Sequence, residues 1–357
     1  MFIPGGHVVD GINLYALAGA AALVVSFCLW LVWRAYRLSE RDKSDEKQIV
    51  KLRRKRLADY EEARKEYDKL RKKIETGNTV LIDLIHDLGD DFVGRDSAQQ
   101  QIAFDEAFEA VASIRQANPR ARVMVVLHTL GGYARPAHMI AQELKQHINK
   151  VKGHHNPKKD PRVVAYIPYV AMSGGTMIAL AADEVRMDPT ASLGPIDTIY
   201  GGFPTDAYKA LIEQKGVLAT QDVLVMLAHE AEKYDQYAVK VARDIVNPAH
   251  KPHGKPKDNT LADHLSSGTL SHSQAISPKD AKDLGMNVKS KIPEAVYGLV
   301  DARIRMINTR LEYESGDGQG GGESRPGDGR GGAGGGDIAE QVMERAIRQS
   351  LRGMMRI

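Results

Sequence analysis

The sequence predicts an α/β fold with a membrane-spanning helix in front of it. Between residues 79 and 188, short apolar runs typical of buried strands alternate with longer segments that are apolar on one side, as in helices. Such alternation predicts a parallel sheet whose strands are joined by right-handed helical crossovers. Residues 15–33 carry no charged side chain, and as a helix they are long enough to cross a hydrocarbon core of roughly 30 Å.

Bulk composition excludes several classes of protein. The 357 residues have a formal net charge of only +3, so the chain as a whole is not expected to bind nucleic acid. A single cysteine, Cys28, rules out an intrachain disulfide. The histidines show no metal-ligand spacing, and we expect neither a metal nor a cofactor.

Charges around residues 15–33 predict the orientation of the anchor. No Lys or Arg precedes Tyr15, whereas Arg34, Arg37, Arg41 and further basic residues follow Trp33. By the positive-inside rule, residues 1–14 are extracytoplasmic, and the rest of the chain faces the cytoplasm from the inner cell membrane. A cleaved signal peptide would need a basic start, and a buried core helix would not need the basic flank.

Residues 34–75 are highly charged and contain neither Gly nor Pro, which predicts one long helix. Apolar side chains recur along it at steps of three and four: Leu57, Tyr60, Ala63, Tyr67, Leu70 and Ile74. This seam favours a short coiled coil or a helix packed on the next domain; the alternative is a solvated helix with a basic face. The basic part could also hold anionic lipid headgroups.

The next domain is expected to span residues 76–313, beginning where "TGN" at residues 76–78 breaks the helix. Four strands are expected, at residues 79–88, 122–129, 162–168 and 184–188. Three helices are expected between them, at residues 97–117, 134–148 and 174–183. After Phe203 the pattern becomes mainly helical, with helices at residues 204–216, 221–247 and 277–286, the last capped by Ser277.

The C-terminal part has a different composition. Residues 314–337 are dominated by glycine and predict a flexible linker. Residues 338–357 predict an amphipathic helix that binds a groove of a partner protein or lies on a membrane surface; a frayed tail is the alternative.

Two glycine pairs suggest a catalytic centre. Gly131-Gly132 and Gly174-Gly175 each lie between an expected strand and an expected helix, and Ser173 directly precedes the second pair. Backbone amides at such turns can point together at a developing oxyanion, helped by the helix dipole. A small serine in a tight turn is the structural alternative.

These segments carry a resemblance to a known family. "HTLGG", "AMSGGTMIALAADEV" and "ASLGPID" resemble the ClpP/crotonase superfamily. Within it they are most similar to the signal peptide peptidase A-like serine peptidases of the serine dehydrogenase proteinase branch. The resemblance implies a spiral of ββα units, a serine that attacks the carbonyl of a peptide or protein substrate, and homo-oligomers that enclose the site.

Carried over by position, the resemblance makes Ser173 the nucleophile and assigns the oxyanion hole to the amides of Gly174 and of Gly131 or Gly132. No histidine follows Ser173 where a Clp-type base would be expected. Membrane relatives use a lysine whose pKa is lowered by burial. The candidates are Lys209, Lys215, Lys233 and Lys240; "EKYDQYAVKVARDIV" resembles the lysine-bearing helix and favours Lys233.

Other polar residues are not given a catalytic role. His128 is interpreted as a core residue or as one that supports the site from behind, Asp197 as a cap or turn residue, and His272 has no assignable chemistry. The sequence therefore predicts a membrane-anchored serine peptidase with a Ser-Lys dyad. The alternatives are a non-catalytic membrane scaffold, the acyl-CoA chemistry of crotonases, which usually lack a serine at this turn, and an α/β-hydrolase, disfavoured by the helical second half.

Overall fold

A computed structural model describes residues 12–88, 101–150, 160–196, 198–200, 203–250, 260–266, 270 and 274–315. The chain divides into two compact units. One comprises Met1–Glu61 and Thr309–Gly320, and the other comprises Glu62–Asn308 and Gly321–Ile357. The residues before 12, which were predicted to be extracytoplasmic, lie outside the described residues, as do residues 316–337 of the predicted linker and the predicted helix 338–357. Residues 314 and 315, predicted to begin the linker, are instead the end of a helix.

The first helix, α1 (Ile12–Ile74), is continuous and confirms the long helix predicted before the α/β region. It ends at the "TGN" break, where Gly77 adopts a φ of 66° that favours glycine. In the second unit, Ala63 and Tyr67 of the apolar seam are buried. Packing on the following domain is thereby confirmed for this part of the helix.

The predicted membrane span is not confirmed. Side chains of α1 are described from Val25 on, with a gap at residues 41–45, so residues 15–24 of the segment are not covered. Within the described residues, no helix is both long enough and apolar enough to cross a bilayer.

A five-stranded parallel sheet forms the centre of the second unit, in the order β1-β2-β3-β5-β9. The strands are β1 (Thr79–Ile85), β2 (Arg122–His128), β3 (Val163–Ile167), β5 (Glu184–Met187) and β9 (Val288–Lys289). The first four agree with the predicted strands, although β1 ends three residues early. The two-residue β9 was not predicted because it is too short to show periodicity.

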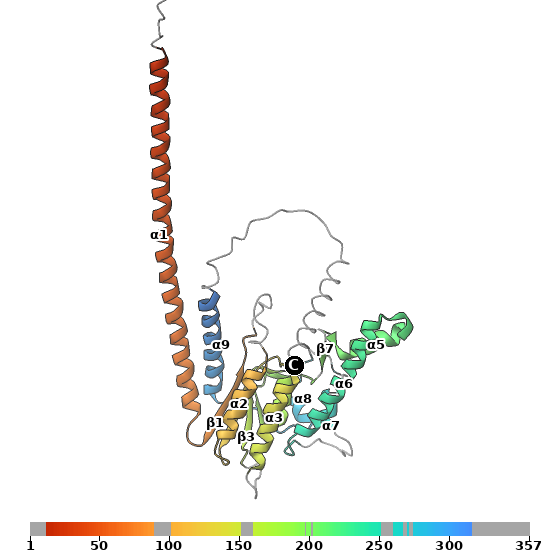
Figure 1. The fold of residues 1–357 in the computed structure, drawn as a ribbon. Coiled ribbons are helices and arrows are strands. Elements are labelled where there is room, and N and C mark those ends of the chain that lie inside the picture. Colours follow the sequence, from red (N-terminus) through yellow and green to blue (C-terminus); the bar gives the residue numbers. More distant parts are fainter. Residues whose placement is uncertain are drawn as a thin grey trace, which may run out of the picture. The chain divides into compact units, whose positions relative to one another are not determined.

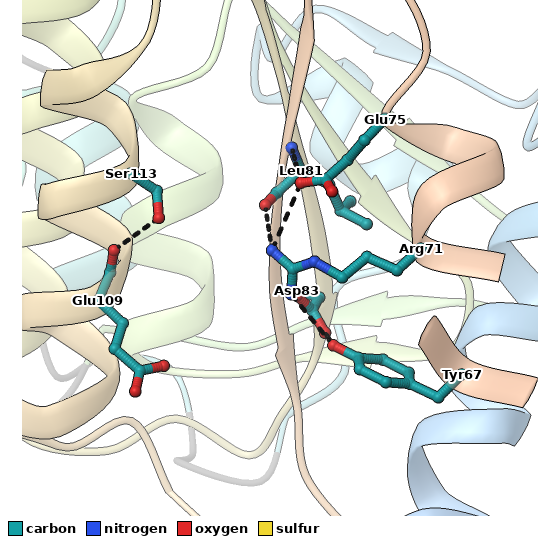
Figure 2. Close-up of polar contacts among 7 residues, drawn as sticks. All are labelled: Tyr67, Arg71, Glu75, Leu81, Asp83, Glu109 and Ser113. Carbon is teal, nitrogen blue, oxygen red and sulfur yellow. Dashed lines mark hydrogen bonds and ion pairs between the residues drawn. The ribbon is translucent and has the colours of Figure 1, made fainter. Parts of the chain in front are cut away.

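Helices cover both faces of the sheet, as its nearly continuous apolar strands require. On one face, α2 (Phe104–Gln116) and α3 (Ala134–Asn149) lie side by side (Figure 1). Core residues such as Ile82, Val125 and Ala165 face them. On the other side of β1 lie the end of α1 and α9 (Glu294–Ser315), as Figure 2 shows.

Polar groups fasten α1 to the sheet. The Arg71 guanidinium donates to the Asp83 carboxylate on β1 at 2.7 Å and to the Leu81 carbonyl at 3.1 Å, and the Tyr67 hydroxyl also donates to Asp83 (Figure 2). Asp83 is nearly fully buried, with 5 % of its side chain exposed. We refer to Tyr67, Arg71 and Asp83 as the α1 latch.

The ββα pattern implied by the resemblance is visible around β3. This strand is followed by β4 (Val170–Ala171) and then by α4 (Gly174–Leu180). β4 pairs in parallel with β6 (Ser192–Leu193), outside the main sheet. The second strand was not predicted, since it occupies only two residues between β3 and α4.

The remaining helices largely match the sequence prediction. α5 (Thr205–Lys215) and α6 (Asp222–Ile245) pack together and flank the 3-10 helix η2 (Val217–Ala219). A short antiparallel pair, β7 (Ile199–Tyr200) and β8 (Phe203–Pro204), precedes them. α8 (Pro278–Asp283) begins at Ser277, whose hydroxyl accepts from the Asp280 amide, so the predicted cap is confirmed. α7 (Thr260–Ser266) and α9 were not predicted.

The predicted start of the helix at residues 97–117 is wrong. α2 begins only at Phe104, and Ile102 instead pairs with the glycine turn before α3. The Ile102 amide donates to the Gly131 carbonyl at 2.8 Å, and the Tyr133 amide donates to the Ile102 carbonyl at 3.0 Å. These long-range hydrogen bonds override the local helical preference of residues 101–103.

Candidate active site

Ser173 occupies a strained turn between β4 and α4. Its backbone has φ 47° and ψ −112°, and no other non-glycine residue in the described ranges has a positive φ. Such a conformation costs about 1–3 kcal/mol and persists only where the surroundings impose it. The Gly175 amide donates to the Met172 carbonyl at 2.7 Å, and the Met177 amide donates to the Ser173 carbonyl at 3.0 Å. The turn therefore presents Ser173, which is half-buried, at the N-terminus of α4.

The Gly131-Gly132 turn lies directly against Ser173. A Cβ atom at Gly131 would lie 2.8 Å from the Ser173 Cβ, and Gly131 has a φ of 112°. A Cβ atom at Gly132 would lie 2.7 Å from the Ile102 Cα and closer still to other atoms of its backbone. Both positions therefore need glycine, and the structure brings together the two predicted turns.

The hydrogen bonds distinguish the two glycines. The Gly131 amide donates to the Thr129 hydroxyl at 3.0 Å and is therefore occupied. The amides of Gly132 and Gly174 donate no hydrogen bond to any described residue. A Cβ at Gly174 would lie 3.6 Å from the Gly132 nitrogen, so the two amides are neighbours. Of the alternatives left open by the sequence, Gly132 has the available donor.

A third segment supports the turn from the other side. The Thr176 hydroxyl lies 2.8 Å from the carbonyls of both Ala171 and Gly194, and it accepts from the Gly194 amide at 3.2 Å. A Cβ at Gly194 would lie 2.6 Å from the Met172 sulfur. The "ASLGPID" segment thus packs tightly against Met172, the residue that precedes Ser173.

Sequence reasoning missed a buried polar chain behind the glycine turn. The His86 Nδ1 lies 2.7 Å from the Thr129 hydroxyl, and its Nε2 lies 3.1 Å from a carboxylate oxygen of Glu106. His86 and Thr129 are buried, whereas Glu106 is partly exposed. His86 immediately follows β1, whose register pairs Ile85 with His128, the residue before Thr129. That expected parallel pairing is the signal that could have brought His86 to Thr129.

None of the four candidate lysines is buried. The Lys233 ammonium pairs with Glu230 at 2.6 Å, and 57 % of its side chain is exposed. Lys209 pairs with Asp235 at 3.3 Å and is 42 % exposed. Lys215 and Lys240 are exposed. In the single chain, none of these four lysines is therefore desolvated as a Ser-Lys dyad requires.

The other singled-out residues are placed as follows. His128 is buried, with the edge of its ring against Tyr169, and burial lowers its pKa to about 4. It is therefore neutral at pH 7. Asp197 and His272 lie outside the described residues. Where the structure describes the chain, no group of three or more His, Cys, Asp or Glu residues could hold a metal ion.

This arrangement defines a class of protein. A serine on a strained turn at the start of a helix, beside two backbone amides that donate to none of the described residues, is the arrangement of a serine hydrolase. Its parallel sheet and ββα element agree with a ClpP-like fold. Residues 50–312 match the pattern of the ClpP-like SDH-type serine proteinases, and the chain belongs to that family.

Two similar proteins come from Methanocaldococcus jannaschii. Uncharacterized protein MJ0137 is 33 % identical over 214 residues, which are 60 % of this chain and 69 % of that protein. Uncharacterized protein MJ1495 is 30 % identical over 201 residues, which are 56 % of this chain and 63 % of that protein. This chain thus spans just under two thirds of the second relative, and neither name states an activity.

Proposed function

We propose that this protein is a serine endopeptidase of the signal peptide peptidase A-like type, with Ser173 as its nucleophile. One observation carries the proposal: Ser173 has a strained, positive-φ backbone beside the unoccupied amides of Gly132 and Gly174. Membership of the ClpP-like SDH-type serine proteinases supports a protease. The crotonase alternative is disfavoured, because acyl-CoA chemistry of that kind does not need a serine at this turn.

The proposed reaction has two steps. The Ser173 oxygen attacks the substrate carbonyl carbon while its proton passes to a base, and the resulting oxyanion accepts hydrogen bonds from the Gly132 and Gly174 amides. The C–N bond then breaks, and the amine leaves with the proton. Water hydrolyses the acyl ester, which regenerates the serine hydroxyl and releases the carboxylate product.

Lys233 is the proposed base, because the segment "EKYDQYAVKVARDIV" resembles the lysine-bearing helix of the family. A lysine accepts a proton near neutral pH only when desolvation lowers the pKa of its ammonium. Because Lys233 is largely exposed in the single chain, the proposal requires a surface that covers it. A homo-oligomer that encloses the site would supply such a surface.

Substitutions test the nucleophile and the base separately. Ser173→Ala and Lys233→Ala are each expected to abolish hydrolysis of a fluorogenic peptide library, and Lys233→Arg is expected to be equally inactive because a guanidinium keeps its proton. The matched controls Lys215→Ala and Lys240→Ala, both exposed, should retain activity. If Lys233→Ala stays active while Lys209→Ala or one of the controls loses activity, the general base is that other lysine and not Lys233. Normal cleavage by Ser173→Ala would overturn the proposal that the protein is a serine peptidase.

A non-catalytic scaffold is the second candidate, and the exposed lysines favour it. It predicts that a fluorophosphonate probe leaves Ser173 unlabelled in the full-length chain. Covalent labelling of wild type, absent in Ser173→Ala, would exclude the scaffold.

We also propose attachment to the inner membrane through residues 15–33, with the catalytic domain in the cytoplasm. The support is the uncharged segment and the basic residues that follow it. After alkaline carbonate extraction, the full chain should stay with the membranes, whereas a chain lacking residues 1–33 should be released. Protease added to intact cells should spare everything beyond Arg34. Release of the full chain would argue against the anchor.

A further inference from the structure

The glycine turn beside Ser173 is held by a chain of hydrogen-bonded side chains, two buried and one partly exposed, that reaches from α2 to the active site. Glu106 on α2 contacts His86 at 3.1 Å, His86 contacts the Thr129 hydroxyl at 2.7 Å, and Thr129 accepts from the Gly131 amide at 3.0 Å. We call Glu106, His86 and Thr129 the turn-holding chain.

Thr129 connects the two halves of the site. Its backbone amide donates to the Val170 carbonyl at 3.1 Å, and its carbonyl accepts from the Met172 amide at 3.0 Å, next to Ser173. Its hydroxyl bonds Gly131. The backbone of Thr129 thus fixes the serine turn, and its side chain fixes the glycine turn.

Occupation of the Gly131 amide has a consequence for the next residue. With Gly131 bonded to Thr129, the amide of Gly132 is the one left beside Gly174. Oxyanion donors act only when they are fixed before the charge develops, since reorientation during the reaction would cost the energy that they supply. A hydrogen bond from the preceding amide supplies that fixation.

Glu106 and His86 orient the threonine hydroxyl. When His86 is neutral and its Nε2–H donates to Glu106, Nδ1 accepts from Thr129, and the lone pairs of the hydroxyl face Gly131. When His86 is doubly protonated, Nδ1–H donates to Thr129, whose proton then turns to the Gly131 carbonyl 3.2 Å away. Both forms keep the Gly131 amide bonded.

The side-chain contacts of the turn-holding chain are not needed to join β1 to β2. Those strands pair in register from Thr79 to Ile85, and the His86 amide continues the ladder to the His128 carbonyl at 2.9 Å. We propose that Glu106, His86 and Thr129 are positioning residues that hold the Gly132 amide in the oxyanion hole. This inference rests on the proposed function, because it assumes that Ser173 attacks a carbonyl-like centre.

The test measures fluorophosphonate labelling of Ser173 in the full-length chain over a range of probe concentrations. The phosphoryl oxygen of the probe takes the place of the oxyanion. Thr129→Val keeps the shape but removes the hydroxyl, and it should lower the maximal labelling rate about 10- to 100-fold, below the loss for a deleted donor. The half-saturating concentration should change less than about twofold, since the donor acts after binding. Thr129→Ser, which keeps the hydroxyl, should recover most of the rate.

A second pair of variants separates positioning from stability. His86→Leu removes both contacts of the imidazole and should reproduce the loss in Thr129→Val. His147→Leu is the matched control, because His147 is equally buried but bonds the Ala121 carbonyl at the far end of α3. It should lower the unfolding temperature while leaving the maximal labelling rate within about twofold of wild type.

The outcomes separate two failures. If wild type is labelled and Thr129→Val reacts at the same maximal rate, the positioning role is overturned while the proposed function stands. The same conclusion follows if His147→Leu slows labelling as much as His86→Leu does. If wild type is not labelled at Ser173, the proposed function fails and the inference fails with it.

Discussion

At the scale of single residues, the backbone of Ser173 carries the strongest sign of function. A positive φ at a non-glycine residue is unfavourable, and the neighbouring contacts of Gly131, Met172 and Thr176 maintain it. The two short sequences "LGG" and "SGG" predicted a tight turn at each position, because only small residues fit where two backbones approach within van der Waals distance.

The strain at Ser173 should be measurable as a difference in the free energy of unfolding between two variants of this residue. Ser173→Gly relieves the strained φ and should raise the free energy of unfolding by about 1 kcal/mol relative to Ser173→Ala, after allowance for the greater unfolded-state entropy of glycine. Both variants lose the hydroxyl, so the comparison isolates the backbone. Urea unfolding checks it, and equal stabilities would show that the turn is not strained.

Which glycine amide would serve the proposed oxyanion hole could not be predicted from the sequence. The choice depends on the Thr129 hydroxyl, which occupies the Gly131 amide. The Glu106–His86 contact joins residues 20 positions apart on different elements, and no local pattern encodes it. For the candidate base, the sequence favours a residue that the single chain does not bury. The resemblance points to Lys233, but desolvation of its ammonium depends on a surface from outside this chain.

At the scale of elements, strands and helices with clear periodicity were predicted to within a few residues. β2 and α3 begin where expected because apolar alternation and amphipathic spacing are strong there. Two-residue strands such as β4, β6 and β9 were missed because each pairs with a strand distant in the sequence. The start of α2 was misplaced because Ile102 pairs with the glycine turn.

The α1 latch should stabilise the second unit. Arg71→Met leaves the buried Asp83 carboxylate without the cation that hydrogen-bonds it, and should lower the free energy of unfolding by about 2–3 kcal/mol. The loss is less than for a fully buried pair, because Arg71 is partly exposed and Arg303 still attracts Asp83. Burial already raises the pKa of Asp83, and loss of Arg71 raises it further. Urea unfolding at pH 7 measures the change.

Arg64→Met is the matched control for the latch. Arg64 lies on the same helix and pairs with Asp68 at 4.0 Å, with 63 % of its side chain exposed. Its removal should change stability by less than about 0.5 kcal/mol. If both variants lose the same amount, the latch contributes no more than an ordinary surface pair.

At the scale of the whole molecule, the division into units does not follow the predicted boundary at residue 76. Residues Glu62–Ile74 belong with the sheet, since Tyr67 and Arg71 bond Asp83. Composition alone could not show this, because the same charged helix runs through both units without a break. The seam at Ala63 and Tyr67 was the available signal, and it indicated packing without indicating the partner strand.

Burial of two neutral histidines predicts how the stability of the whole fold depends on pH. Desolvation lowers the pKa of His128 and of His250 from 6.5 to about 4. Between those values the unfolded chain binds protons that the folded chain does not, so the free energy of unfolding falls as the pH falls. From pH 7 to pH 5 each histidine should account for a loss of about 2 kcal/mol.

Two further histidines act in the same window, whereas the carboxylates act mainly below it. Desolvation also lowers the pKa of His138 and of His147, which adds to the loss of stability as the pH falls. Hydrogen bonds lower the pKa of Asp188 and Asp280, and for Glu184 hydrogen bonds from Lys289 and Arg186 outweigh the opposing effect of burial, so the contributions of these carboxylates are lost only below the ordinary carboxyl range. Burial raises the pKa of Asp83, which opposes the histidines in part. Urea unfolding from pH 7.5 to 4.5 should therefore show a steady loss, and His128→Gln and His250→Gln should each make that slope shallower, because glutamine does not titrate. A slope that is the same in wild type and both variants would show that these histidines do not control the acid response of the fold.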